Sequence, residues 1–384
     1  MTIRPTRMEV RLDNIRANYR AIMNHIRPDG RPGKEPRVFA VLKANAYNLG
    51  AVPVAWAVKQ EGADFFIVAT ADEALELRAG GITDPVLVLG ASPYEGAWEL
   101  VRHDIRSALT DLEMARHLSK AAVVQGKKAY VHIKIDSGMG RIGFLPEEAA
   151  DAAAAAAALP GVVCEGVFTH FATADEADLT HTYNQRRVFL EALDAIEERG
   201  VHIPIKHCCN SGGTLSMPEW AMSGVRPGQL LVGLYPSPDV PRSIPILPGF
   251  SFKTAISALR TVPAGKGISY GLTYTTEKEE KLAVLPVGYA DGFDRRFSNN
   301  ADVLIGGKRC PIVGRICMDQ CMANVSALPE VKVGDEVVLV GPQGDEEITA
   351  YEYAEKLGTI VATVGAMIGP RVPRVYVDKT EELP

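Results

Sequence analysis

The chain of 384 residues is predicted to be an α/β protein, a (β/α)8 barrel of the TIM type followed by a mostly β C-terminal domain. Between residues 37 and 235, short apolar, β-branched runs alternate with stretches of helical period. This alternation predicts a parallel sheet covered on both faces, and its repetition about eight times favours closure into a barrel. Beyond residue 250 the sequence pattern changes to strand-like runs separated by glycine turns.

The expected barrel strands are RVFAVLKA, DFFIVA, PVLVLG, RSALT, AYVHIKI, VVCEGVF, IKHCCN and LLVGLY. Helical spacing appears between them in AVPVAWAVKQEG, ADEALELRAGG, LEMARHLSKAAVVQG and YNQRRVFLEALDAIEERG. The alanine tract 151–160 predicts another outer helix, because alanine is the best helix former. A doubly wound open sheet is the alternative, but no GxGxxG follows the first strand.

A proline-rich stretch, 236–249, indicates the domain boundary. We therefore expect residues 11–240 to form the barrel and residues 241–384 to form the β-rich domain, with one helix near 351–357. MEVRLD, close to the N-terminus, is also strand-like. The segment 1–13 is expected to join the C-terminal domain, with a helix leading from it into the barrel.

Composition and charge exclude several classes of function. The net charge of −6 and pI of about 5.8 give no basic surface for nucleic acid or an anionic membrane. No apolar run resembles a signal peptide or approaches the roughly 20 residues of a membrane helix. The six cysteines form no CxxC pair, so we expect no metal site and a cytoplasmic protein with reduced thiols.

The C-terminal ends of barrel strands face one common site, and the residues predicted there are mostly cationic. So much positive charge needs an anion or carboxylates beside it. The turns NSGG (210–213) and RPGQ (226–229) offer backbone N–H groups to a phosphate. A phosphate beside a lysine that can form a Schiff base indicates pyridoxal 5'-phosphate. The predicted residues, in strand order with Arg226 preceding the eighth strand, are Lys43, Lys134, Asp136, Arg141, His170, His207, Asn210, Ser211 and Arg226.

Each residue also has a structural interpretation. Lys43 alone could pack its stem on the barrel rim, and His170 alone could be a core histidine. Asp136 could neutralise a neighbour, and GMGRIG could be a turn chosen for its shape. Convergence at five strand ends favours a functional site over five separate coincidences.

Eight segments of the chain resemble the alanine racemases in the same order and at the expected spacing, from about Arg11 to Val377. KANAY is shared with other fold-type III pyridoxal enzymes, whereas SYG, GYADG and GRICMDQ in a β domain are specific to the family. The resemblance implies a pyridoxal phosphate-dependent isomerase that interconverts L- and D-alanine, and D-alanine supply for peptidoglycan in a bacterium. The segments are VLKANAY, HIKIDSGMGRIG, THFATADE, HCCNSGG, ISYGLTY, PVGYADG, VGRICMDQ and RVPRVYV.

The resemblance also implies roles for individual residues. Lys43 is similar to the lysine that holds the cofactor and acts as one base. Tyr270 is similar to the tyrosine that a partner subunit inserts as the second base, which implies a homodimer with shared sites. Two bases are needed because a planar α-carbon has two faces. The implied cofactor-binding residues are Lys43, Tyr47, His170, Asn210, Ser211, Arg226 and Gly228, and the implied substrate-binding residues are Arg141, Tyr289, Met318 and Asp319.

Within this set, Arg226 is similar to the arginine that donates to the pyridine nitrogen and keeps it unprotonated, because arginine does not give up its proton. His170 resembles the residue that steadies this arginine. Arg141 resembles the one that orients the substrate carboxylate, and Lys134 matches a lysine that is N-carboxylated in several family members.

The sequence departs from the family at two places. Asn48 and Leu49 replace a usual Gly-His, and Pro370 stands where a tyrosine usually precedes RVPR. That tyrosine touches the cofactor phosphate and narrows the pocket in the family. Proline has neither a hydroxyl nor an N–H, so we expect a roomier pocket and activity on serine.

Three other functions compete with the racemase. A fold-type III decarboxylase would place an acidic residue at the pyridine nitrogen, where this chain offers Arg226. A non-catalytic pyridoxal phosphate-binding protein would resemble the barrel alone. A structural barrel with a basic mouth would leave Lys43, Tyr270 and Arg226 as coincidences.

Overall fold

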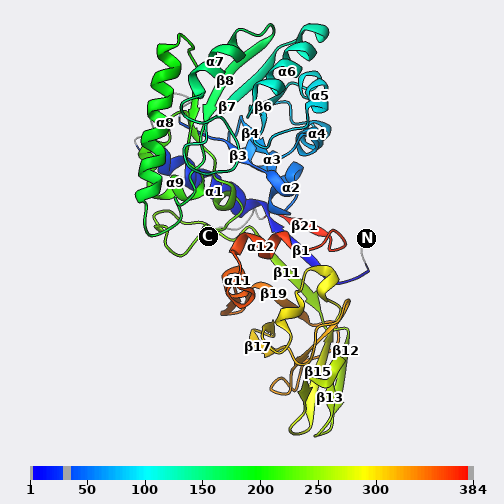
Figure 1. The fold of residues 1–384 in the computed structure, drawn as a ribbon. Helices are drawn as coiled ribbons and strands as arrows, with labels where there is room; N and C mark the ends of the chain where they lie inside the picture. The colour runs from blue at the N-terminus through cyan, green and yellow to red at the C-terminus, as the bar shows by residue number, and fades with distance from the viewer. Residues whose placement is uncertain (1–2, 29–35, 379–384) are drawn as a thin grey trace. The chain divides into compact units, whose positions relative to one another are not determined.

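The computed structural model describes residues 3–28 and 36–378, and these form two compact units. One unit is Ile15–Leu247. The other combines the described residues up to Asn14 with those from Pro248 onward. The chain can be followed through both units in Figure 1.

The larger unit is built on parallel strands that close into a barrel. Seven of them pair in the order β3-β4-β5-β6-β7-β8-β9, and β2, which precedes β3, pairs with β10. The amide of Arg226 donates to the Cys209 carbonyl at 2.9 Å and that of Ser223 to Lys206 at 3.0 Å, which joins β10 to β9. The predicted barrel is therefore confirmed. Its strands are β2 (Arg37–Val38), β3 (Ala40–Val41), β4 (Phe66–Val68), β5 (Val86–Val88), β6 (Ile105–Leu109), β7 (Ala129–Lys134), β8 (Val162–Phe168), β9 (Ile205–His207) and β10 (Gly224–Val225).

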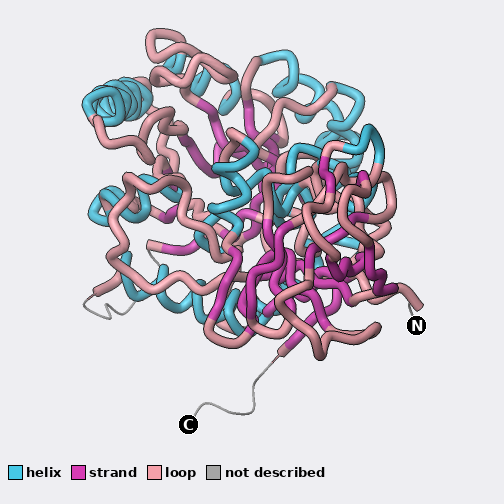
Figure 2. Tube along the Cα trace, turned by 90° about the horizontal axis from the view of Figure 1, so that it is seen from below, coloured by secondary structure: helices cyan, strands magenta, loops and turns pink. Residues whose placement is uncertain are grey.

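Helices surround these strands, as Figures 1 and 2 show. Local sequence signals fix their ends: Thr70 and Glu73 form a capping box on α4, and Asp111 caps α6, which stops at Gly126 in a left-handed conformation. The alanine tract lies in α7, as predicted. The elements are α1 (Leu12–Ile26), α2 (Lys43–Tyr47), α3 (Ala51–Lys59), α4 (Ala71–Ala79), η1 (Tyr94–Gly96), α5 (Ala97–Arg102), α6 (Leu112–Gln125), α7 (Ala149–Ala157), α8 (Thr180–Glu198), α9 (Ser211–Ser216), η2 (Pro218–Trp220) and α10 (Gly228–Leu231).

The eighth strand is not the one predicted. LLVGLY was expected to be a strand, but its first residues belong to α10, and the strand is Gly224–Val225 instead. Arg226 therefore follows the eighth strand rather than preceding it. A short apolar run cannot be distinguished by composition from a buried helical turn, and here Pro227 fixes the start of such a turn.

The smaller unit is mostly β, as expected. Its main sheet has the order β17-β16-β19-β11-β1-β21, with β20 on β19, and β1 pairs antiparallel with β11 and parallel with β21. Separate sheets are β12-β15-β18 and β13-β14. The strands are β1 (Arg7–Arg11), β11 (Phe250–Ala255), β12 (Ala258–Val262), β13 (Gly267–Ile268), β14 (Tyr274–Thr275), β15 (Glu280–Leu285), β16 (Asp302–Ile305), β17 (Lys308–Pro311), β18 (Cys321–Asn324), β19 (Glu336–Gln343), β20 (Glu346–Ile348) and β21 (Arg374–Val377).

This unit holds two α-helices among its described residues, not the single one predicted. The expected helix is α11 (Ala350–Leu357), and α12 (Val361–Ala366) follows it. The second was missed because VATVGA is short and contains β-branched residues and a glycine, which are poor helix formers. Single-turn 3₁₀ helices are η3 (Tyr270–Leu272), η4 (Tyr289–Asp291) and η5 (Arg295–Phe297).

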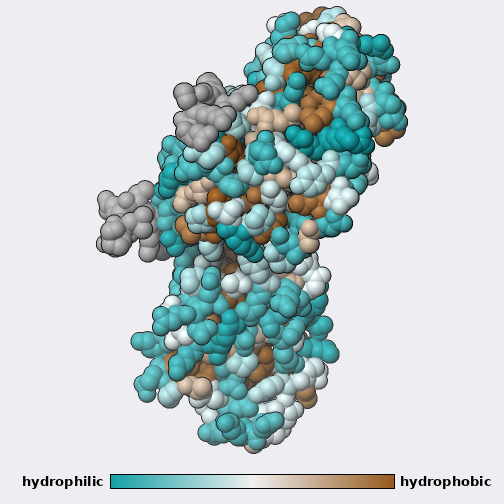
Figure 3. Space-filling model, turned by 90° about the vertical axis from the view of Figure 1, so that its left-hand side faces the viewer, coloured by the Kyte–Doolittle hydropathy of each residue, from teal (hydrophilic) through white to brown (hydrophobic). Residues whose placement is uncertain are grey.

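Hydrophobic residues on the face drawn in Figure 3 occur as patches between hydrophilic ones. Among the helices of residues 3–28 and 36–378, none is both long and apolar enough to cross a membrane.

A buried carboxylate stabilises the smaller unit. Asp291 is fully buried, and its oxygens accept from Arg4 and from Arg371, both at 2.6 Å, and from the Gly288 amide at 2.9 Å. Burial raises the pKa of this carboxyl, but the bonds from Arg4, Arg371 and Gly288 outweigh it and lower the pKa below its usual value.

We therefore expect Asp291→Asn to lower the free energy of unfolding by about 3 kcal/mol at neutral pH, because two arginines lose their buried partner. The lowered pKa means that the contribution of Asp291 is complete above about pH 4 and disappears as pH falls through the folded-state pKa. Urea unfolding of both proteins from pH 7 to pH 3 measures this. A difference that stays constant over that range would contradict it.

Candidate active site

One cavity of about 120 Å³ lies at the C-terminal ends of the barrel strands. It brings together seven residues singled out from the sequence: Lys43, Tyr47, His170, Asn210, Ser211, Arg226 and Gly228. Six further residues complete its lining: Gly212 and Gln229, which lie in the turns predicted to bind phosphate, and Val41, Leu89, Asp175 and Pro236, which were not predicted.

Lys43 begins a left-handed turn. Each residue from Ala44 to Tyr47 has a φ between 51° and 56°, and Asn48 has a φ of 74°. The left-handed conformation costs about 1–2 kcal/mol for each non-glycine residue, so the surrounding structure must hold this turn in place. Asn48, which replaces the glycine usual in the family, is among the residues that tolerate this conformation best.

Glu73, at the start of α4, anchors the turn. One carboxylate oxygen accepts from the Ala44 amide at 2.6 Å, and the other accepts from the Ala69 amide at 2.7 Å. The Asn45 side chain in turn accepts from the Ala51 amide at 2.7 Å. The capping glutamate of one helix thus also fixes the backbone next to Lys43, a role that the capping signal in the sequence does not reveal.

Lys43 is exposed at the mouth of the barrel, yet the protein around its ammonium group lowers its pKa. Desolvation is the largest cause, the positive charge of Arg141 adds to it, and Glu73 opposes it. A larger fraction of Lys43 is therefore the neutral amine, which is the form that attacks a carbonyl or accepts a proton.

Arg226 is 3% exposed and has only neutral partners among the described residues. Its guanidinium donates to Nδ1 of His207 at 2.9 Å, to Nδ1 of His170 at 3.3 Å, and to the carbonyls of Thr169 and Cys208. Arg226 lines the cavity, and its Nε is buried and has no hydrogen-bond partner in the described part of the chain. Arg226 therefore carries an N–H that needs an acceptor.

Burial and the charge of Arg226 together keep the neighbouring histidines unprotonated. Burial, followed by the charges of Arg226, Arg141 and other cations, puts the pKa of His170 well below its usual value. Burial and Arg226 do the same to His207. Both histidines are neutral at physiological pH and accept hydrogen bonds from Arg226.

Lys134 is 1% exposed, and its ammonium donates to the Ile135 carbonyl at 2.7 Å. Burial lowers its pKa to about 8, with Arg226 and Arg141 adding to this effect and Asp136 opposing it. Part of the Lys134 population is therefore the neutral amine at neutral pH.

The Asp136 carboxylate shapes the loop that carries Arg141. It accepts from four successive amides, those of residues 138 to 141, at 2.8 to 3.1 Å. Burial raises the pKa of Asp136, but the backbone hydrogen bonds outweigh this and lower it. Asp136 is therefore an ionised organiser of the loop, which neither sequence interpretation had anticipated.

Close approach of the backbone shapes the rest of the cavity. A side chain at Gly228 would place its Cβ 2.0 Å from the Tyr47 hydroxyl, so the Tyr47 ring occupies space that only glycine leaves free. Asn210 caps α9 by accepting from the Gly213 amide at 3.0 Å. Ser211 and Gly212 line the cavity beside it.

The remaining predicted residues belong to the smaller unit, where loops gather them. Amides of residues 289 and 290 donate to the carbonyls of Cys317 and Met318, both at 3.1 Å. A Cβ at Gly288 would lie 2.3 Å from the Cys317 carbonyl oxygen, so this approach requires glycine. Tyr289 and Met318 are about half exposed, and Asp319 forms an ion pair with Arg371 at 2.8 Å.

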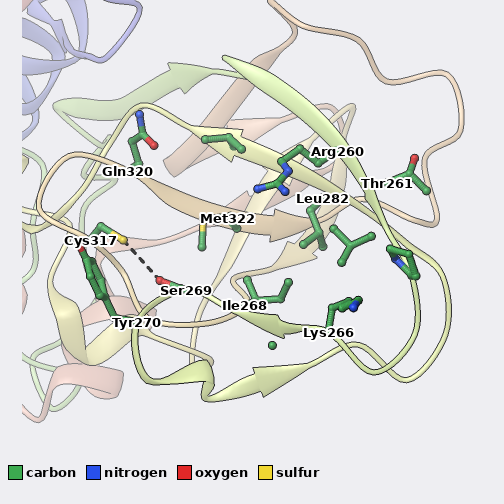
Figure 4. A pocket seen from close by; sticks show the side chains of 14 residues that line it. Arg260, Thr261, Lys266, Ile268, Ser269, Tyr270, Leu282, Cys317, Gln320 and Met322 are labelled. Atoms are coloured by element: carbon green, nitrogen blue, oxygen red, sulfur yellow. Dashed lines mark hydrogen bonds between the residues drawn. The ribbon is translucent and has the colours of Figure 1, made fainter.

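Tyr270 lies beside this loop. Ser269, which has a φ of 62°, donates to the Arg315 carbonyl at 2.6 Å and lies 3.5 Å from the Cys317 sulfur. Figure 4 shows Tyr270 and Cys317 at one end of a hollow of about 680 Å³. Tyr270 is 68% exposed in this unit.

Together these features define a barrel protein that presents a partly neutral lysine and an unsatisfied arginine N–H to a small cavity. Two family models cover most of the chain: the alanine racemase N-terminal domain matches residues 10–236, and the alanine racemase C-terminal domain matches residues 250–376.

Whole-chain comparisons agree. "Alanine racemase 2" of Caldanaerobacter subterraneus subsp. tengcongensis is 45% identical over 380 residues, which cover 99% of this chain and 96% of that protein. The alanine racemase structure from Clostridium difficile is 41% identical with a TM-score of 0.93 and covers 100% of this chain and 98% of its own. A histidine racemase from Leuconostoc mesenteroides subsp. sake is also similar, at 27% identity and a TM-score of 0.88, over 98% and 99% of the two chains.

The chain belongs to the alanine racemase family, whose members are pyridoxal phosphate-dependent isomerases. The resemblance recognised in the sequence is confirmed, and relatives and structures support alanine racemase activity.

The lowered pKa of Lys43 predicts selective acylation. In protein cleared of bound carbonyl compounds by hydroxylamine, we expect Lys43 to be half-labelled by acetic anhydride at a lower pH than a free lysine side chain. Glu73→Gln removes the charge that opposes this effect, so the midpoint should fall further, by roughly half a unit. Mass spectrometry of digests made across pH gives both midpoints. Glu76→Gln, on the exposed face of α4, is the control, and a higher midpoint in Glu73→Gln would refute the electrostatic argument.

Proposed function

We propose that the protein interconverts L- and D-alanine with pyridoxal phosphate held at the barrel mouth. The observation that carries this proposal is the shared cavity of Lys43, whose pKa is lowered, and Arg226, whose Nε lacks an acceptor.

The residues present fit this cofactor. The Nε of Arg226 would donate to the pyridine nitrogen, and Lys43 would hold the carbonyl carbon. Tyr47, Asn210, Ser211 and Gly228 would bind the phosphate, since all of them line the same cavity and Gly228 leaves backbone N–H groups uncovered by a side chain. Arg226 argues against a decarboxylase, in which an acidic residue would occupy its place.

The bound cofactor would withdraw electrons from the α-carbon of an attached amino acid and so acidify its α-proton. Lys43 would then remove or return this proton on one face, because its lowered pKa makes the neutral amine available. Tyr270 would do the same on the opposite face, with its exposed phenol supplied by a second subunit of a homodimer.

Three further residues would support these bases. Arg226 would keep the ring nitrogen unprotonated, because arginine donates but does not transfer its proton. Arg141 would orient the substrate carboxylate, with Tyr289, Met318 and Asp319 of the partner subunit lining the entrance. Lys134 would carry an N-carboxylate, whose formation its pKa of about 8 favours and whose negative charge would attract Arg141. A cytoplasmic location and D-alanine supply for peptidoglycan stay predictions from the sequence.

Specificity is proposed to extend beyond alanine. Pro370 stands where the family carries a tyrosine that narrows the pocket, and it offers neither a hydroxyl nor an N–H. Serine, whose side chain is one hydroxyl larger than that of alanine, is the first additional substrate that we expect the wider pocket to accept.

The shared site predicts complementation between two inactive variants. We expect Lys43→Ala and Tyr270→Phe each to lose a factor of about 100 to 10,000 in turnover of L-alanine. A mixed dimer, isolated through two different affinity tags, combines one intact site with one doubly altered site. It should regain about half of the native rate.

An inactive mixed dimer would show that each site uses bases from its own chain. Turnover of no amino acid by the native protein, with the cofactor bound and absorbing visible light, would instead favour a decarboxylase or a cofactor carrier.

The role of Pro370 predicts how serine and alanine compare. We expect Pro370→Tyr to lower the ratio of serine to alanine racemisation, measured as kcat/KM, by about tenfold, because the ring refills the pocket. Pro370→Ala restores the N–H without the ring and is the matched control. A native serine rate more than about a thousandfold below that for alanine would contradict the proposal.

A further inference from the structure

A chain of hydrogen bonds runs through the barrel interior from Arg226 to a carboxylate. Nη1 of Arg226 lies 2.9 Å from Nδ1 of His207, and Nε2 of His207 lies 2.9 Å from Nδ1 of His132. Nε2 of His132 lies 3.3 Å from a carboxylate oxygen of Glu165. Both histidines are fully buried. We call these four residues the Arg226–Glu165 chain.

The two ends of this chain impose one direction on it. Arginine can only donate, so Nδ1 of His207 must accept, and the proton of this neutral ring resides on Nε2. His207 then donates to Nδ1 of His132. The proton of the His132 ring therefore lies on its Nε2, which faces Glu165. An ionised carboxylate can only accept, so Glu165 requires the same tautomer that Arg226 requires from the other end.

The backbone is adapted to this contact. Val131 pairs with Cys164 and His132 with Gly166, so Glu165 is an extra residue on β8. A bulge of this kind redirects a side chain, and it is rare between parallel strands. A Cβ at Gly166 would lie 2.3 Å from the His132 ring, so glycine provides the space for that ring. Phe168 stacks on the His207 ring with centroids 5.0 Å apart, which keeps the ring plane fixed.

Glu165 also supplies a negative charge for the buried Arg226 cation. The direct partners of Arg226 found in the described residues are all neutral, so no carboxylate touches this buried cation. The charges facing the two histidines are the cations Arg37, Arg106 and Arg226 and the anion Glu165. Glu165 is therefore the anion to which the Arg226 charge is connected, and its ion pair with Arg106, at 3.1 Å, keeps it ionised.

We propose that Glu165 is a positioning residue that holds the Arg226 guanidinium through His132 and His207, as the ionised acceptor that ends their chain of hydrogen bonds. The inference rests on the proposed function, in which Arg226 holds the cofactor ring. Its structural part, the fixed tautomers, can be tested whether or not the protein racemises alanine.

Glu165→Gln tests the charge without a change of shape. Its control is Glu61→Gln. Glu61 has the same side-chain exposure of 18% and also pairs with an arginine, but it does not belong to the Arg226–Glu165 chain. In holoenzyme labelled with [¹⁵N]histidine, we expect both native rings to be neutral with the proton on Nε2 from pH 7 to pH 9. In Glu165→Gln the bond from Arg226 still requires the proton of each ring on Nε2, so the tautomers should persist, but the Nε2–H signal of His132 should move upfield, because a neutral amide oxygen accepts more weakly than a carboxylate.

Glu165→Gln should also release the cofactor about tenfold faster and lower kcat for alanine more than it changes KM, because an arginine hydrogen bond loses its fixed geometry. Absorbance decay during dialysis measures the release. Arg106→Gln removes the ion pair but leaves the bond from Glu165 to His132, so it should keep the native His132 Nε2–H signal and the native rate of cofactor release. If Glu165→Gln fails to fold, the native protein still tests the proposal. A native signal from either ring with the proton on Nδ1 would overturn it. Ring signals and release rates in Glu165→Gln equal to those of Glu61→Gln would overturn it as well.

Discussion

The buried positive charge of Arg226 constrains the other groups at the barrel mouth. A cation in a poorly hydrated interior disfavours further cations around it. Burial, with the charge of Arg226 added, puts the pKa of His170 and His207 well below the usual value and lowers that of Lys134 to about 8, and burial with the charge of Arg141 lowers that of Lys43. The cations predicted from the sequence thus reduce to two permanent charges, Arg226 and Arg141, beside groups that can accept protons.

This arrangement has a chemical consequence for Lys43. A base must be neutral before it can remove a proton, and an amine in water is almost fully protonated at neutral pH. The desolvation and positive charge that would be unfavourable in a structural site here produce the form that is needed. Glu73 limits the effect, because the carboxylate that holds the left-handed turn also draws the Lys43 pKa back upward.

Much of this could be predicted from sequence, because periodicity identifies strands and a barrel carries their C-terminal ends to one side. That logic placed Lys43, His170 and Arg226 at one cavity although the eighth strand was misassigned. The left-handed turn after Lys43 could not be predicted, since no glycine within it marks the positive φ values. The bulge at Glu165 exists only in the pairing of β8 with β7, which no local pattern encodes.

Two of the features that local rules fail to anticipate lie at the candidate site. The left-handed turn lies next to Lys43, and the bulge between parallel strands supplies the carboxylate that ends the chain from Arg226. Unfavourable backbone geometry persists only where the surroundings hold it, and in proteins it concentrates where chemistry requires it. Because each of these deviations fixes the position of one of two groups, Lys43 and Arg226, their coincidence is itself an argument that these groups act together on one ligand.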